Sequence, residues 1–276
     1  MEKIRRFYQY LKSKYDLLSL KKYTTIAGTL VFFLILSIVP FTFWLTLIIG
    51  RLPIDLEQVL RLSVFSSVKD VFLYVQREAA SATAGASVLL VLTTLYSATN
   101  LFYQMRRSGE IVYGYERPRP GFRVRVGALA LMFIVMLMMV VFLSLFALGT
   151  FLFSRFLSGA LERVADYTLL AALAFALVLL LNMYICPYKA KARYFLPGTV
   201  ITVAAWAVAV VGFAIYLKIS NMDKLYGALS VVIVFLLWLY VMMICFIAGV
   251  IFNSERITFE RDEKNKRRRK SRKKNA

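Results

Sequence analysis

Residues 23–50 read YTTIAGTLVFFLILSIVPFTFWLTLIIG and contain no charged side chain. A helix needs about 20 predominantly apolar residues to cross a hydrocarbon core of roughly 30 Å, so this stretch is long enough to span a membrane. Pro40 lies near its middle, soon after Ser37, and predicts a kinked or unwound helix. Backbone groups freed at such a break must face protein or a water-filled cavity. A structural kink and a substrate cavity both fit this pattern.

Five further windows are similarly long, apolar and uncharged. The six windows are 23–50, 79–105, 126–154, 167–188, 195–217 and 225–254. Backbone groups in lipid must be bonded within the structure, and short alternating barrel strands are absent from the sequence, so the windows predict helices. We therefore expect an all-α integral membrane protein whose six transmembrane helices form one membrane domain, 23–254.

The composition removes several classes of function. Of 276 residues, 60% are hydrophobic and 18% charged, and the formal net charge is +20. There is no His, which excludes catalytic and metal sites that depend on His, and the two Cys are too few for a disulfide framework. The six windows also lack the ionisable residues of a proton relay. We expect no enzyme, no cofactor and no metal site.

The basic residues are concentrated in alternate connecting segments. Of the 35 Lys and Arg, 27 fall on one predicted side of the membrane, in 1–22, 106–125, 189–193 and 255–276. Because cytoplasmic loops carry the excess of Lys and Arg, this distribution predicts that both termini are cytoplasmic. The first apolar window is too long for the core of a cleaved signal peptide, so we expect it to remain as an anchor.

Two segments outside the windows have helical periodicity. Residues 1–22 predict a basic amphipathic helix on an anionic leaflet, with Arg5, Arg6 and Lys12 contacting anionic lipid, although packing against the bundle fits the same pattern. Residues 51–78 predict an extracytoplasmic helical segment between the first two spans. That segment could cap the bundle or rest at the interface.

The tail, 255–276, ends in the run KNKRRRKSRKKNA. Its density of like charge predicts disorder. Topology anchoring, attraction to anionic phospholipids and nucleic-acid contact are three uses of such a run. Nucleic-acid binders usually add a folded module or stacking aromatics, which this tail lacks, so we expect no nucleic-acid partner. Anionic-lipid contacts are expected at Arg267, Arg268 and Arg269.

Polar and breaking residues mark a candidate cavity near the first and sixth spans. Asn100, Asn182 and Asn253 lie toward the predicted cytoplasmic ends of their windows, where Asn usually bonds between helices and sometimes contacts substrate. Small residues at 79–87 suit close helix packing within the chain or in a homo-oligomer, and both remain open. The candidate cavity or helix-break residues are Ser37, Pro40, Asn100, Tyr226, Gly227, Trp238, Tyr240 and Asn253.

Several motifs together resemble the YihY/BrkB family of bacterial inner-membrane proteins. The first span's Ala27-Gly28-Thr29 and Leu36–Phe41 are similar to the family's opening, and Tyr96–Asn100 followed by Arg117–Pro120 resembles its second-span exit. The strongest similarity is C-terminal: Leu196-Pro197-Gly198, Tyr226-Gly227-Ala228-Leu229, Trp238-Leu239-Tyr240 and Gly249. In order and spacing these motifs cover nearly the whole chain.

The resemblance implies a six-helix protein of the bacterial plasma membrane with cytoplasmic termini. Some relatives carry the label ribonuclease, and others are associated with serum resistance or proposed to move lipid-like molecules. Two acidic positions common in the family are absent here. Ala207 follows Trp206 in the fifth span, and the sixth span reads Gly249-Val250-Ile251 where the family often has G-A-E. A coupling role carried by those acids is therefore in doubt for this chain.

Two functional hypotheses follow. The first is a transporter or flippase-like protein for an amphiphilic or small-molecule substrate, with a cavity beside Pro40 and the sixth span. The alternative is a non-transporting membrane scaffold or surface-defence factor that acts through 51–78 or the basic tail. A nuclease is disfavoured, because the predicted cytoplasmic acids form no metal-binding motif.

Overall fold

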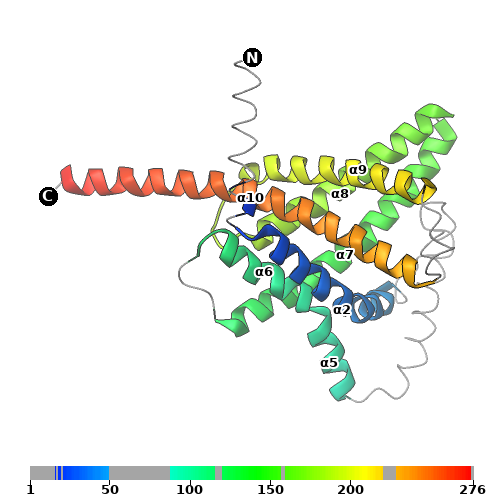
Figure 1. Ribbon diagram of the computed structural model, residues 1–276, viewed down its shortest axis with the longest axis horizontal. Coiled ribbons are helices and arrows are strands. Elements are labelled where there is room, and N and C mark those ends of the chain that lie inside the picture. The colour runs from blue at the N-terminus through cyan, green and yellow to red at the C-terminus, as the bar shows by residue number, and fades with distance from the viewer. Residues whose placement is uncertain are drawn as a thin grey trace. The chain divides into compact units, whose positions relative to one another are not determined.

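The structure is a computed structural model that describes residues 16, 18–19, 21–49, 88–115, 120–156, 159–219 and 228–274 (Figure 1). Every regular element within these ranges is a helix, as the apolar windows predict. The elements are α2 (Tyr23–Ile49), α5 (Val88–Ala98), α6 (Asn100–Val112), α7 (Gly121–Phe156), α8 (Ala160–Ile185), η2 (Ala192–Tyr194), α9 (Leu196–Ile219) and α10 (Ala228–Lys274). The predicted outer segment 51–78 lies outside the described residues, as does most of the predicted amphipathic segment 1–22.

Five described helices are long and apolar enough to cross a membrane. Their membrane-crossing parts are Tyr23–Leu45, Gly121–Phe156, Ala160–Ile185, Leu196–Tyr216 and Val232–Arg261. Each coincides with one of the predicted windows. The remaining window, 79–105, is not among them. Its first part lies outside the described residues, and the rest is divided between α5 and α6.

The first span contains Pro40, where the sequence predicts a kinked or unwound helix. The helix is not unwound there, since α2 runs without interruption from Tyr23 to Ile49 and includes Pro40. A proline removes one N–H donor and leaves the other hydrogen bonds of the helix intact, and membrane helices tolerate that loss. The interruption occurs instead in the second predicted span, between α5 and α6.

The C-terminal tail also differs from its prediction. Disorder is predicted for 255–276, but α10 continues as a helix through the basic run to Lys274. The sequence from Glu255 to Lys264 contains both acids and bases, and Glu260 stands four residues before Lys264, a favourable helical pair. Extending an existing helix avoids the cost of nucleation, and Lys, Arg and Glu are good helix formers.

The described chain divides into two compact units. The first comprises Met1–Val31, Met105–Pro118 and Val178–Ala276, and the second comprises Phe32–Gln104 and Arg119–Leu177, where the structure describes them. Three helices contribute to both units: α2, α6 and α8. We describe each unit by itself.

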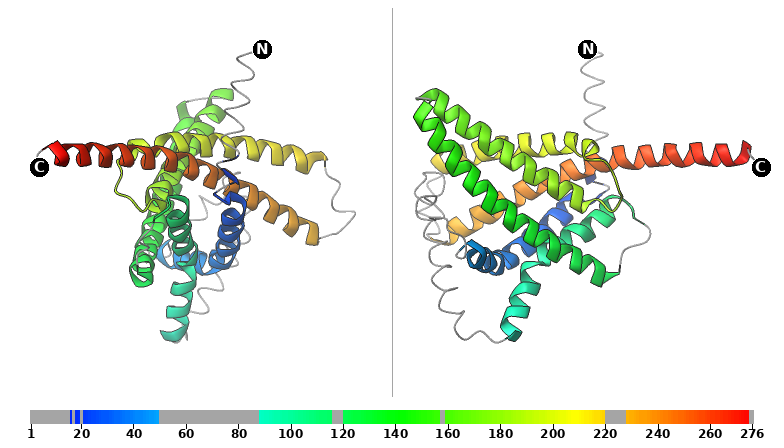
Figure 2. Two further views of the ribbon diagram at one scale, coloured as in Figure 1. Left: turned by 60° about the vertical axis from the view of Figure 1, so that its left-hand side comes forward. Right: turned by 180° about the vertical axis from the view of Figure 1, so that it is seen from behind.

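In the first unit, α9 and α10 run side by side, as Figures 1 and 2 show. Their closest approach is a pair of glycines. A Cβ added at Gly198 would overlap the carbonyl oxygen of Gly249, and one at Gly249 would overlap the hydroxyl of Thr202. Small residues of this kind let membrane helices pack backbone against backbone.

In the second unit, α7 and the first part of α8 approach closely at another glycine. A Cβ at Gly149 would overlap the side chain of Leu169. Gly159, at the start of α8, has a φ of 63°, a conformation that glycine adopts without strain. Gly159 therefore suits the backbone conformation that precedes α8, and Gly149 lets α7 approach the Leu169 side chain.

We predict that Gly198→Ala destabilises the protein, because the added methyl group has no room against α10. Overpacking of this kind costs about 1–3 kcal/mol. The matched control is Gly212→Ala in the same helix, where a Cβ meets nothing within 4 Å. Thermal unfolding of both variants in detergent is the measurement. Equal transition temperatures for Gly198→Ala and Gly212→Ala would contradict the close packing of α9 on α10.

Candidate functional site

The second predicted span is interrupted at Thr99, between α5 and α6. The backbone amide of Thr99 still bonds the carbonyl of Leu95, and the amide of Tyr103 bonds the carbonyl of Thr99. Between these two bonds, side chains satisfy backbone groups. The Thr99 hydroxyl donates to the carbonyl of Tyr96 at 2.8 Å. The break therefore changes how the polar groups of the chain are bonded.

A serine of the first span completes the bonding at this break. The hydroxyl of Ser37, on α2, donates to the carbonyl of Ser97 at 2.9 Å and accepts from the amide of Leu101 at 3.3 Å. Ser97 and Leu101 are four residues apart, the spacing of a helical hydrogen bond. Ser37 is 3% exposed, so water does not compete for either partner. The Ser37 hydroxyl thus takes the place of the helical hydrogen bond between the Leu101 amide and the Ser97 carbonyl.

Arg125, in the first turns of α7, contacts residues at the break and on either side of it. Its Nη1 donates to the side-chain oxygen of Asn100 at 2.8 Å and to the hydroxyl of Thr99 at 3.3 Å. Its Nη2 donates to the hydroxyl of Tyr96 at 2.9 Å. The Cζ atom also lies 4.0 Å from the ring centroid of Tyr96 and 4.1 Å from that of Tyr103. We call Arg125 with Tyr96, Thr99, Asn100 and Tyr103 the arginine cluster.

The described groups that contact Arg125 are neutral. Among the described residues, the groups that contact it are hydroxyls, an amide oxygen and aromatic rings. Cation–π contacts and neutral hydrogen bonds orient a guanidinium without cancelling its charge. The cluster also has an open side, since Arg125 is half-buried and Tyr96 is 56% exposed. The arrangement can attract an anion.

A second polar cluster, in the first unit, joins three helices. Asn253, on α10, donates to the side-chain oxygen of Asn182 on α8 at 3.2 Å and to the carbonyl of Phe195 at 3.2 Å. Its own side-chain oxygen accepts from the amide of Gly198 on α9 at 2.9 Å. Asn182 in turn donates to the hydroxyl of Thr199 at 3.3 Å. We call this set the asparagine joint.

The asparagine joint is fully buried. Both Asn side chains and the Thr199 side chain are 0% exposed, and the amide groups of both Asn are engaged in hydrogen bonds. A fully satisfied buried network fixes the packing of helices and leaves no polar atom for a ligand. Asn253 therefore lies at a helix junction of the first unit, whereas Asn100 belongs to the arginine cluster of the second unit.

The other predicted cavity residues are dispersed. Trp238 stacks on Phe213 of α9 with ring centroids 5.8 Å apart, and the Tyr240 hydroxyl lies 3.5 Å from the carbonyl of Thr24. Pro40 lies within the unbroken α2. The remaining predicted residues cannot be placed: Tyr226, Gly227, Arg5, Arg6 and Lys12 lie outside the described residues, as do the side chains of Arg267, Arg268 and Arg269.

Basic residues bond the carbonyl ends of helices in the first unit. Buried Arg106 donates from Nη1 to the carbonyls of Tyr184 and Cys186, at the end of α8. Lys21 donates to the carbonyl of Val112, at the end of α6, at 2.6 Å. The last carbonyls of a helix lack helical partners and carry partial negative charge, so cations stabilise them. Arg106 and Lys21 therefore stabilise the ends of helices.

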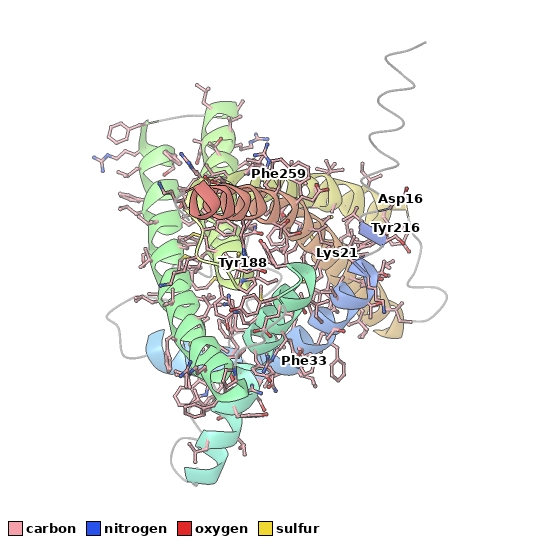
Figure 3. The ribbon with its side chains drawn as sticks, turned by 90° about the vertical axis from the view of Figure 1, so that its left-hand side faces the viewer. Asp16, Lys21, Phe33, Tyr188, Tyr216 and Phe259 are labelled. Carbon is pink, nitrogen blue, oxygen red and sulfur yellow. The ribbon has the colours of Figure 1, made fainter. Side chains whose placement is uncertain are left out.

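The segment between α8 and α9 packs against α10. The Cζ of Arg261 lies 4.2 Å from the ring centroid of Tyr188, which Figure 3 shows beside α10. Tyr194 donates its hydroxyl to Glu260 at 2.6 Å. Nearby, burial raises the pKa of the Tyr113 phenol above its usual value, so this phenol stays protonated at physiological pH. Here the extension of α10 beyond the apolar window makes specific contacts.

Sequence reasoning counted Arg125 only as one of the charges of the 106–125 segment. The sequence does contain a pattern that indicates the role of Arg125. Tyr96, Asn100 and Tyr103 recur at helical spacing in an apolar window, and Arg125 immediately precedes another. The contact between them could not be inferred, because it depends on how two spans pack. Among the described residues, no group of three His, Cys, Asp or Glu is placed to hold a metal ion.

A family model described as Virulence factor BrkB matches residues 15–275. The chain belongs to this family. The motif resemblance to the YihY/BrkB family is thereby confirmed, and with the five apolar helices it makes the chain a multi-pass membrane protein. Comparisons with curated proteins and with solved structures gave no significant match. The specific roles of its residues must therefore be argued from their geometry.

We predict that Ser37→Ala destabilises this BrkB-family protein by about 1–3 kcal/mol, because the Ser97 carbonyl and Leu101 amide lose a buried partner. Ser144→Ala is the matched control, since among the described residues the Ser144 hydroxyl bonds only the Val140 carbonyl of its own helix. The measurements are thermal unfolding and hydrogen exchange of the peptide containing Leu101. Unchanged stability and exchange in Ser37→Ala would show that the hydroxyl bridge is unimportant.

Proposed function

We propose that this BrkB-family protein moves amphiphilic molecules across the membrane. The proposal rests mainly on one observation, the interruption of the second predicted span at Thr99 with Ser37 bonded into the gap. Interrupted helices are the usual way in which transporters place polar backbone and movable segments at membrane depth. A hinge of this kind gives α5 and α6 two possible arrangements about Thr99.

The bonding at the break supports such a motion. The Ser37 hydroxyl replaces one helical hydrogen bond, and a helix that closed the gap would bond Ser97 to Leu101 directly. Net contributions of hydrogen bonds are about 0.5–1.5 kcal/mol, so exchange between these two patterns is energetically accessible. Closing the gap would also move Thr99 and Asn100 relative to Arg125. In this proposal the break and the arginine cluster move together.

The lipid-facing surface favours an amphiphilic substrate. α7 carries exposed apolar side chains along its length, including Val126 and Leu137, at 51% and 62% exposure. The arginine cluster lies at the Gly121 end of this helix. A molecule with an apolar tail and a charged head matches a surface of this kind. We propose further that both termini are cytoplasmic, on the excess of basic residues, which places the arginine cluster toward the cytoplasm.

A membrane scaffold or surface-defence factor is the second candidate. The asparagine joint favours it, since its buried, fully bonded side chains hold α8, α9 and α10 in one arrangement. A protein that only displays surfaces to partners needs such rigidity and no hinge. The two candidates therefore differ in whether the break at Thr99 moves during function.

Transport is testable with purified protein in liposomes that contain fluorescent phospholipids. We expect wild-type protein to move labelled lipid between leaflets faster than protein-free liposomes, as measured by chemical quenching of the outer leaflet. Ser37→Ala should slow this rate at least about fivefold, the effect of roughly 1 kcal/mol on a barrier, while Ser144→Ala should not.

Two results would count against the proposal. If the wild-type protein moves no labelled phospholipid, with or without an imposed membrane potential or pH gradient, transport is wrong and the scaffold is favoured. If the wild type moves lipid but Ser37→Ala and Ser144→Ala have equal rates, the break at Thr99 is not the moving element. Intact folding of each variant is checked by its thermal transition.

A further inference from the structure

We propose that Arg125 binds the phosphate group of an anionic lipid headgroup. The inference names a substrate class for the arginine cluster, and it rests on the proposed function only in treating the bound lipid as cargo. Binding itself requires no transport.

The guanidinium retains donors for a ligand. It has five N–H groups, and among the described residues three are used, by Thr99, Asn100 and the Tyr96 hydroxyl. The two that remain are the Nε–H and one N–H of Nη2, on adjacent nitrogens. Adjacent guanidinium N–H groups form the fork that binds two oxygens of a phosphate. A point donor such as an ammonium could not make this paired contact.

The contacts orient Arg125 before a ligand arrives. Two aromatic rings, with centroids 4.0 and 4.1 Å from Cζ, and three hydrogen bonds hold the side chain. None of the described groups that contact it is a carboxylate, so these contacts leave its positive charge in place. A cation held in one orientation at the edge of an apolar surface is a favourable site for an anion, since less side-chain entropy is lost on binding.

The surroundings favour a phosphate that carries an apolar chain. Phe122 and Val126 flank Arg125 in α7 and are 80% and 51% exposed. Along α7, Phe133 and Leu137 continue this exposed apolar surface away from the arginine. Free phosphate could use only the fork, whereas a lipid phosphate could use the fork and the apolar surface together. The lipid is therefore expected to bind more tightly than the free ion.

The test compares Arg125→Gln with Arg123→Gln. Arg123 lies in the same helical turn and is exposed, so both variants remove the same charge. Binding of phosphatidylglycerol, phosphatidylcholine and inorganic phosphate to the purified full-length protein is measured by native mass spectrometry and by competition. Thermal transitions verify folding. Arg125→Lys keeps the charge but removes the fork, and serves if the glutamine variant is unstable.

We expect Arg125→Gln to weaken phosphatidylglycerol binding by about tenfold or more, the effect of one charged hydrogen-bonded contact. Arg123→Gln should weaken it by less than about threefold, as for a solvent-exposed charge. Arg125→Lys should fall between Arg125→Gln and the wild type. Phosphatidylglycerol should bind more tightly than phosphatidylcholine and than inorganic phosphate.

Three outcomes would overturn the inference. Undiminished phosphatidylglycerol binding in Arg125→Gln, or in Arg125→Lys where it is the variant used, would exclude Arg125 as the contact. Equal losses in Arg125→Gln and Arg123→Gln would indicate general attraction to the basic surface. Inorganic phosphate binding as tightly as phosphatidylglycerol would assign the site to the free ion. If binding depends on Arg125 while liposomes show no lipid movement, the headgroup site stands and the transport proposal fails.

Discussion

Backbone polar groups at membrane depth have no water to bond, so an interrupted span is stable only where other groups take their place. In this protein the Ser37 hydroxyl does so, since it donates to the Ser97 carbonyl and accepts from the Leu101 amide. Thr99 contributes in the same way through its own hydroxyl. These side-chain hydrogen bonds of Ser37 and Thr99 determine the arrangement of Thr99 and Asn100. The contacts of Arg125 depend on that arrangement.

The two polar clusters illustrate different uses of side chains within apolar helices. In the asparagine joint both amide groups are engaged and fully buried, which fixes the packing of α8, α9 and α10. In the arginine cluster the partners are neutral and the site is partly exposed, which leaves positive charge at an apolar surface. The first arrangement favours stability, because the amide groups of both Asn are bonded. The second favours binding, because the described contacts of Arg125 use three of its five N–H groups.

Much of the fold could be predicted from the sequence, since uncharged windows of sufficient length mark the spans, and five of them are helices long enough to cross a membrane. The interruption at Thr99 could not. Pro40 is the residue with an obvious breaking tendency, yet α2 continues through it, and the break at Thr99 is bonded by Ser37 on a neighbouring helix. Likewise the net charge of the tail predicts disorder, whereas pairing between nearby acids and bases favours continuation of α10. Asn100 was identified from sequence, but its partner Arg125 required the packing of two helices.

The most direct test of this account is an experimental structure of the protein in lipid nanodiscs, at a resolution that places side-chain hydroxyls. The account predicts that the Ser37 oxygen lies within hydrogen-bonding distance of both the Ser97 carbonyl and the Leu101 amide. It also predicts that α5 and α6 are separated at Thr99 and that the guanidinium of Arg125 contacts Asn100. If every conformation in that structure has a continuous helix through Thr99, with Leu101 bonded to Ser97 and Ser37 turned toward lipid, the account is contradicted.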